Sequence, residues 1–284
     1  MKTTVSSASK EVVIGTDTTV LIGERINPTG KKMLAEELRN GKFDIVTREA
    51  REQVEAGALI LDVNVGTGGV NEAALLPETV KAVIEEVDVP LCIDSGDPSA
   101  IEAALKVYKG KPIINSVNGE EISLDRVLPL VKSYGTAVIA LLKDENGIPN
   151  DFETRLKIAE KIVARCGKMG IPVEDIIMDC LAISVAVDNK AGLVTLETIR
   201  GVKERFGCNV TLGASNVSFS LPGREIVNST FLPLAIEAGL TCPVVDAAKV
   251  KKSVVAADLV LGRDRFAQKY LSYYRQHKDN FSSL

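Results

Sequence analysis

Asp and Asn residues recur along this chain, each following a short apolar run. The recurring set is Asp62, Asn64, Asp94, Asn115, Asp179 and Asn216. Carboxylate and carboxamide groups offer hydrogen-bond acceptors and donors but no strong nucleophile. An Asp accepts two N–H donors from an amino-pyrimidinone edge, and an Asn donates to one nitrogen while it accepts from another. The set therefore favours recognition of a heterocycle rich in N–H and C=O groups.

The Asp and Asn residues of this set, and others along the chain, also have a simpler interpretation. A single Asp or Asn after a strand is usually a helix cap or a turn residue. We prefer that interpretation for Asp44, Asn71 and Asp97. Asp62 has the alternative role of orienting a loop, and for Asp246 the two interpretations are evenly balanced. For the set as a whole, convergence on one site is the better interpretation.

The elements that must position this set follow a repeating order of strand and helix. Strands are expected at 20–23, 59–65, 90–94, 112–116, 137–142, 175–179, 210–214 and 243–246. Helices are expected at 31–40, 44–57, 77–87, 98–106, 124–134, 152–169, 196–206, 226–238 and 253–274. The strands are apolar and mostly non-alternating, which is typical of a parallel sheet with both faces buried.

Eight such units predict one (β/α)8 barrel spanning 1–284, whose strand ends meet at one mouth. An open doubly wound sheet is the alternative. Residues 1–18 form an extension, in which residues 12–14 are expected to be a short strand that closes the barrel floor.

Composition narrows the function classes. The net charge of −4 argues against a general nucleic-acid or membrane-surface binder. The five cysteines are scattered and are expected to be buried and reduced, and the one histidine, His277, lies in a polar tail. Zinc and Ser-His-Asp chemistry are therefore disfavoured, and no metal ligands are expected. Neither a signal peptide nor a membrane-spanning run is visible, so we expect a cytoplasmic protein.

Several ordered motifs resemble one family. They are Ile22-Gly23-Glu24-Arg25-Ile26-Asn27-Pro28-Thr29-Gly30, Leu61-Asp62-Val63-Asn64-Val65-Gly66, Cys92-Ile93-Asp94-Ser95, Ile114-Asn115-Ser116 and Gly213-Ala214-Ser215-Asn216-Val217-Ser218. Together they are similar to the pterin-binding barrels of methyltetrahydrofolate–corrinoid methyltransferases, including the folate module of cobalamin-dependent methionine synthase. The likeness extends from about residue 20 to about residue 274.

The resemblance implies a (β/α)8 barrel, usually a homodimer, that holds a tetrahydrofolate in its mouth. It also implies methyl transfer, in either direction, between N5 of that folate and the cobalt of a corrinoid. Carried over by motif, Asp94, Asn115 and Asp179 hold the pterin ring, and Asn216 forms a hydrogen bond at N5. Second candidates are Asp62 and Asn64 below the ring and Arg224 on the loop after Asn216.

A corrinoid protein is the expected partner. The chain contains no Asp-x-His-x-x-Gly corrinoid-binding signature, so the cobalamin is expected to come from that partner, with tetrahydrofolate or methyltetrahydrofolate as substrate.

Two other functions remain open. Dihydropteroate synthase resembles the same barrel, but its loop after the seventh strand carries a Ser-Arg pair and a nearby Lys. Here Asn216 follows Ser215, and no Lys occurs in 217–226. A non-catalytic folate-binding protein is the third possibility. One departure from the methyltransferase pattern is Cys180, which follows Asp179 where Pro is expected, so the geometry of that loop is an open question.

Overall fold

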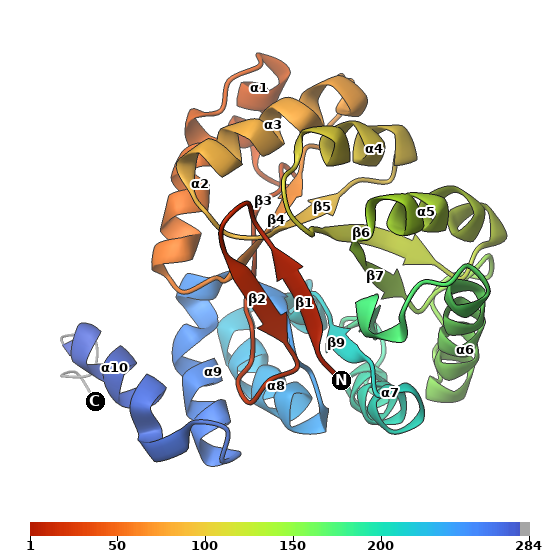
Figure 1. Ribbon diagram of the computed structural model, residues 1–284. Helices are drawn as coiled ribbons and strands as arrows, with labels where there is room; N and C mark the ends of the chain where they lie inside the picture. Colours follow the sequence, from red (N-terminus) through yellow and green to blue (C-terminus); the bar gives the residue numbers. More distant parts are fainter. Residues whose placement is uncertain (279–284) are drawn as a thin grey trace.

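The computed structural model describes residues 1–278 as a barrel of parallel strands surrounded by helices (Figure 1). The strands form one eight-stranded sheet in the order β10-β3-β4-β5-β6-β7-β8-β9. Their bounds are β3 Ile22–Ile26, β4 Ile60–Asn64, β5 Leu91–Asp94, β6 Ile113–Asn118, β7 Ala137–Leu141, β8 Ile176–Asp179, β9 Asn209–Thr211 and β10 Val244–Val245. The ring closes where Val244 N donates to Leu212 O at 3.0 Å and a parallel bridge joins Gly213 to Val244. This closure confirms the barrel and excludes the open sheet.

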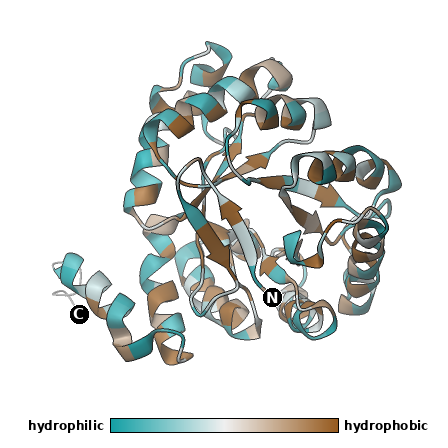
Figure 2. Cartoon of the chain, in the orientation of Figure 1, coloured by the Kyte–Doolittle hydropathy of each residue, from teal (hydrophilic) through white to brown (hydrophobic). Residues whose placement is uncertain are grey.

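Helices cover the outside of the barrel. Their bounds are α1 Lys32–Arg39, α2 Asp44–Glu55, α3 Glu72–Glu86, α4 Pro98–Val107, α5 Glu121–Tyr134, α6 Phe152–Lys168, α7 Ala191–Phe206, α8 Arg224–Ala238, α9 Ala247–Val260 and α10 Gln268–Gln276. Figure 2 shows apolar strands at the centre and helices with mixed faces. The helices that pack on the sheet present an apolar stripe to it and polar residues outward, as surface helices do. Helix α10 has no buried residues and packs on α9 instead.

Several predicted helix boundaries were wrong. Helix α7 begins at Ala191 rather than at 196, and α9 begins at Ala247 rather than at 253. Helix α3 begins at Glu72, and Pro77 lies inside it rather than at its start. The Asn71 side chain accepts a hydrogen bond from Ala74 N at 3.3 Å, and this cap sets the earlier start. The helix predicted at 253–274 is two helices, because α9 ends at Val260 and Gly262 follows with φ of +71°. A left-handed residue at this position is a common helix stop.

The three predicted caps had different outcomes. Asn71 caps α3, and Asp97 caps α4 by accepting from Ser99 N at 2.9 Å. Asp44 is not a cap, because it is the first residue of α2 and its side chain makes no capping hydrogen bond. Its carboxylate lies instead in the first helical turn, where negative charge is favourable beside the helix dipole.

A β-hairpin covers one end of the barrel. Strands β1 Thr3–Ser6 and β2 Glu11–Ile14 pair antiparallel and cross in front of the barrel in Figure 1. Val5 and Ile14 are fully buried against the inward-facing side chains of the barrel, among them Ile22 and Ile60. The predicted strand at the barrel floor is therefore confirmed, although it belongs to a hairpin.

Side chains alternate between the inside and the outside of the barrel. In β4, Ile60 packs in the inner cluster with the hairpin, whereas Leu61 and Val63 pack in the outer cluster beneath the helices. Successive residues of a strand face opposite sides, so Asp62 and Asn64 share the inner side with Ile60. The inner wall is therefore apolar near the hairpin and polar near the carboxyl ends of the strands.

Candidate functional site

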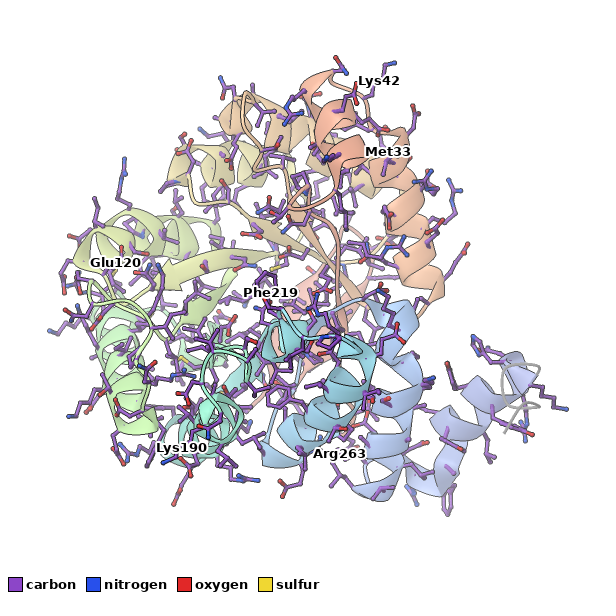
Figure 3. The ribbon with its side chains drawn as sticks, turned by 180° about the vertical axis from the view of Figure 1, so that it is seen from behind. Met33, Lys42, Glu120, Lys190, Phe219 and Arg263 are labelled. Atoms are coloured by element: carbon purple, nitrogen blue, oxygen red, sulfur yellow. The ribbon has the colours of Figure 1, made fainter. Side chains whose placement is uncertain are left out.

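A cavity of about 1450 Å³ opens at the carboxyl ends of the strands, opposite the hairpin. Figure 3 views the molecule from that side, where Phe219 lies near the centre. The predicted residues that line the cavity are Asp62, Asp94, Asn115, Asp179, Asn216 and Arg224. Asn64 does not line it, but its Nδ2 atom donates to Asp94 Oδ2 at 2.9 Å. The structure thus brings the predicted set together, with Asn64 behind Asp94.

Strand register explains this convergence. Asn64 lies beside Asp94 in the sheet, and Asp94 lies beside Asn115. Neighbouring side chains on one face of a sheet are close enough to form hydrogen bonds. Asn115 Nδ2 donates to Asp62 Oδ1 at 3.0 Å, one layer closer to the floor. Asn64 and Asp62 therefore hold Asp94 and Asn115, which leaves one oxygen of Asp94 and the Oδ1 atom of Asn115 for a ligand.

Asp179 is held by the loop that follows β8. Its Oδ1 atom accepts a hydrogen bond from Leu181 N at 2.8 Å. The fully buried Arg155 fixes this loop, because Nη1 donates to Cys180 O at 2.6 Å and to Leu181 O at 2.8 Å. Cys180 is buried within the loop, where a Pro was expected from the family pattern. The open question about this loop is answered by Arg155, which clamps its two carbonyl groups.

Burial changes the protonation of the site. Burial raises the pKa of Asp179 to about 6, and it raises the pKa of Asp94 to about 6. The pKa of Asp62 is raised well above its usual range, first by burial and then by the nearby charge of Asp94. At neutral pH Asp94 and Asp179 are mainly carboxylates, and the protein shields both from solvent. A ligand that donates N–H groups to them would relieve their desolvation.

Asn216 follows β9, across the barrel from Asp94 on β5, and lies in a 3-10 turn at Ala214–Ser218. A Cβ atom on Gly213 would approach the Asn216 Nδ2 atom to 3.0 Å, so the preceding glycine leaves room for the carboxamide. Arg224 braces this turn, because its Nη2 donates to Ser215 O at 2.8 Å and its Nε to Ser218 Oγ at 3.0 Å. The side chain of Asn216 is exposed to the cavity and available to a ligand.

Several polar residues of the cavity were not predicted as site residues, among them Glu24, Lys31 and Asp246. Glu24 lies in β3 and Asp246 directly follows β10, each one residue beyond the pair Val245–Gly23. Burial, and then the charge of Asp246, raise the pKa of Glu24. Burial lowers the pKa of Lys31. The signal for Glu24 was present: it follows an apolar run, as the other strand-end residues do.

The buried cysteines agree with the sequence. All five are free thiols and buried. No helix in the described part of the chain has both the length and the apolar character needed to cross a membrane.

Comparison with known proteins identifies the family. Residues 23–246 match the family described as pterin binding enzyme. The chain is 32% identical over 268 residues to a methylcorrinoid:tetrahydrofolate methyltransferase from Eubacterium limosum, a match that covers 91% of this chain and 97% of that protein. It is 31% identical to a methionine synthase from Mycobacterium leprae over 87% of this chain, but this match spans 22% of that longer protein.

Solved structures share the fold. A Yersinia pestis dihydropteroate synthase with a pterin-sulfa conjugate superposes with a TM-score of 0.70 at 14% identity, covering 91% of this chain and 99% of that one. A Xanthomonas albilineans dihydropteroate synthase superposes with a TM-score of 0.70 at 17% identity, covering 92% of this chain and 98% of that one. The two TM-scores show a common barrel. The family match over residues 23–246 and the relative at 32% identity show that this chain belongs to the pterin-binding enzyme family.

Proposed function

We propose that this protein is a methyltransferase that moves a methyl group between N5 of tetrahydrofolate and the cobalt of a corrinoid. The observation that carries the proposal is the cluster of Asp94, Asn115 and Asp179 at one mouth, in a chain 32% identical to a methylcorrinoid:tetrahydrofolate methyltransferase. Their free oxygens supply the acceptors that the amino-pyrimidinone edge of a pterin requires.

In this proposal the three residues bind and orient the pterin ring, and Asn216 acts at N5. The cobalt of the corrinoid supplies the methyl-accepting or methyl-donating centre. A methyl group on a neutral amine is transferred poorly, because the amine is a poor leaving group. A hydrogen bond from the Asn216 carboxamide to N5 stabilises the charge that changes there during transfer. An amide is not a strong acid, so the N5 proton must come from another group or from solvent.

The rest of the barrel aligns the two reactants. Asp62 and Asn64 hold the ring-binding residues, and Arg224 holds the turn that carries Asn216. Fixed alignment of two reactants lowers a barrier by several kcal/mol, up to about 7–11 in well-oriented cases. This contribution does not depend on the direction of transfer, so one site serves both directions.

A spectroscopic methyl-transfer assay under anoxic conditions tests the proposal. The protein is mixed with methylcobalamin and tetrahydrofolate, and separately with cob(I)alamin and methyltetrahydrofolate. We expect the corrinoid absorbance to change only when protein and folate are both present. Folate binding without transfer in either direction, also with a corrinoid protein as the methyl carrier, would contradict the methyltransferase. The condensation of a pterin pyrophosphate with p-aminobenzoate would then be assayed.

The partners follow from the same chemistry. A corrinoid protein brings the cobalt to the mouth, and the reaction takes place in the cytoplasm between soluble partners.

We also propose a homodimer. It is supported by the exposed apolar side chains near the C-terminal helices, where Val260 is 84% and Phe266 is 76% exposed. Sedimentation velocity of wild type and Phe266→Glu tests this point, because a monomeric wild type would contradict it.

A further inference from the structure

Transfer of a methyl group from N5 to cobalt leaves N5 in need of a proton, and the carboxamide of Asn216 is too weak an acid to supply it. Two acidic residues lie on the same side of the mouth as Asn216. Strands β10 and β3 are neighbours in the sheet, and the bridge from Gly213 to Val244 joins β10 to the segment that carries Asn216. Glu24 on β3 and Asp246 after β10 line the cavity there, opposite β5.

A β-bulge interrupts β3 at Glu24. Gly23 pairs with Leu61 and Ile26 pairs with Val63, so β3 advances three residues where β4 advances two. Bulges change the direction of a side chain and are frequent beside active sites. Glu24 is half-buried in this bulge and faces the cavity.

The side chain of Gln53 on α2 holds the bulge in place. Gln53 is 1% exposed, its Oε1 atom accepts a hydrogen bond from Arg25 N at 2.8 Å, and its Nε2 atom donates to the backbone of α2 at 3.1 Å. Gly23 leaves room for this amide, because a Cβ atom there would lie 2.5 Å from Gln53 Oε1. Lys31 Nζ donates to Arg25 O. Both backbone groups of Arg25 are thus held, which fixes the position of Glu24 next to it.

The carboxylate beside Glu24 lacks a hydrogen-bond donor. Asp246 and Glu24 each lie one residue beyond the pair Val245–Gly23. The Oδ1 atom of Asp246 is buried and accepts no hydrogen bond within residues 1–278, whereas its Oδ2 atom lies 3.6 Å from Lys249 Nζ. Two ionised carboxylates side by side repel each other, and a protonated Glu24 would instead be a donor for this oxygen.

Charged groups from several elements surround Glu24. They are Asp246 and Lys249 at the start of α9, Lys31 before α1, Arg224 at the start of α8 and Asp62 on β4. Burial, and then the charge of Asp246, raise the pKa of Glu24, and the three cations oppose this rise. A folate in the cavity excludes further water from Glu24 and favours the neutral acid more strongly.

From this geometry we propose that Glu24 is the acid that protonates N5, and that Asp246 accepts a hydrogen bond from its carboxyl group. This inference rests on the proposed function. When the bond between the methyl carbon and N5 breaks, its electron pair stays on N5 and takes the proton of Glu24, directly or through one water molecule. The methyl carbon bonds to the cobalt of cob(I)alamin, which supplies the electron pair of the new bond. Glu24 is left as a carboxylate and regains a proton from solvent. In the reverse direction the carboxylate accepts the proton of N5.

Glu24→Gln tests this role, because a carboxamide keeps the size and polarity of the side chain but releases no proton. Transfer from methyltetrahydrofolate to cob(I)alamin is followed under anoxic conditions, and folate affinity is measured by calorimetry. We expect kcat to fall by about 10²–10⁴-fold. Folate affinity should stay within about threefold, because only the reaction step needs the proton. Glu24→Asp, which keeps an acid, should restore part of kcat.

Glu225→Gln is the matched control. Glu225 also lines the cavity, but it is exposed and lies on α8, away from the bulge in β3. Its substitution should leave kcat and folate affinity at their wild-type values.

The pH dependence of kcat separates proton transfer from a structural role. Transfer to cob(I)alamin needs the protonated form of Glu24, so kcat of wild type should fall as pH rises through the pKa of Glu24. Asp246→Asn removes a charge that raises this pKa, so the fall should move to lower pH. In Glu24→Gln the fall should be absent. Ionisation of Asp94 and Asp179 improves pterin binding as pH rises and cannot produce this fall.

The outcomes separate the two proposals. Folate binding by wild type without transfer in either direction, also with a corrinoid protein, would contradict the proposed function. Transfer by wild type that is retained in Glu24→Gln would overturn the role of Glu24, as would equal losses of kcat and folate affinity. An unchanged pH profile in Asp246→Asn would overturn the pairing of Glu24 with Asp246.

Discussion

The carboxyl groups that make the site useful also make the empty protein less stable. Asp94 and Asp179 are half-buried at the end of their strands, and both pKa values are raised to about 6 by desolvation. Within residues 1–278, Asn64 is the only side chain that donates a hydrogen bond to Asp94, and Asp179 accepts one backbone N–H, from Leu181. Their remaining acceptor capacity is left for the ligand. Ligand binding and folding therefore make opposite demands on these residues.

Replacement of Asp179 by Asn should stabilise the ligand-free protein at neutral pH. The pKa of about 6 lies above the usual 3.8, so the folded state binds this proton more tightly than the unfolded state does. Wild type therefore loses stability as pH rises from about 4 to 6, by roughly 3 kcal/mol, and stays level above that. Urea unfolding should show the gap between Asp179→Asn and wild type opening over this range.

A matched control separates ionisation from the local hydrogen bond. Asp97 also accepts from the backbone N–H two residues on, Ser99 N at 2.9 Å, but it is exposed, and its hydrogen bonds to Ser99 lower its pKa. Asp97→Asn should therefore change the pH dependence of stability in the opposite direction, because a lowered pKa adds stability as pH rises. A stability difference for Asp179→Asn that is the same at pH 4 and pH 7.5 would contradict the assigned cause.

Replacement of Asn216 by Ala should affect transfer far more than binding. The side chain makes no hydrogen bond to another described side chain, so its loss costs the fold little. Removal of one hydrogen bond that stabilises developing charge lowers kcat by about 10²–10³-fold. Folate binding, measured by calorimetry, should weaken by less than about 10-fold, roughly one neutral hydrogen bond. Equal losses in kcat and affinity would exclude the N5 role.

At the scale of elements, the loop after β8 depends on a helix far from it in sequence. Arg155, near the start of α6, has no exposed surface and donates to Pro149 O, Cys180 O and Leu181 O. These carbonyl groups take the place of a carboxylate partner for the buried guanidinium. Arg155 therefore positions Asp179 through the backbone of its loop.

Replacement of Arg155 by Met should destabilise the protein by about 2–5 kcal/mol, because it leaves buried carbonyl groups without donors. It should also weaken folate binding, since Asp179 loses the loop that holds it. Lys at the same position cannot reproduce the fork of donors and should restore only part of both losses. The control is Arg205→Met on α7, where an exposed pair with Glu153 contributes ~0–1 kcal/mol. Unchanged folate affinity in Arg155→Met would show that the hydrogen bonds of Arg155 to the loop do not affect folate binding.

Residues that follow a local pattern could be predicted from the sequence, whereas residues held by distant contacts could not. Asp94, Asn115 and Asp179 were predictable because each ends an apolar run, and strand ends meet in a parallel barrel. Glu24 was missed because the first strand was ended at Gly23, whereas β3 continues to Ile26 and places Glu24 within it. Arg155 had no local signal. The two carbonyl groups that it holds in the loop after β8 lie 25 and 26 residues away, and only the folded chain brings them to Arg155.

At the scale of the whole molecule, the barrel divides its two ends between stability and function. The floor is closed by Val5 and Ile14, which pack with inward-facing apolar side chains such as Ile113 and Ile177. The mouth is polar and open, and all ring-binding candidates lie there. This division is common in (β/α)8 barrels, where the two ends vary independently.

Replacement of Ile14 by Ala tests this division. Ile14 is fully buried, so the truncation should leave a cavity and lower the free energy of unfolding by about 2–5 kcal/mol. Folate affinity and kcat, measured well below the melting temperature, should stay within about twofold of wild type, as expected for independent sites. Val13→Ala, on the other face of the same strand and only partly buried, should cost clearly less stability. A loss of folate affinity in Ile14→Ala would instead show that the hairpin is coupled to the mouth through the barrel interior. Strand positions such as Ile60, which lies one layer below Asp62, would then be the next to substitute, because they connect the two ends along single strands.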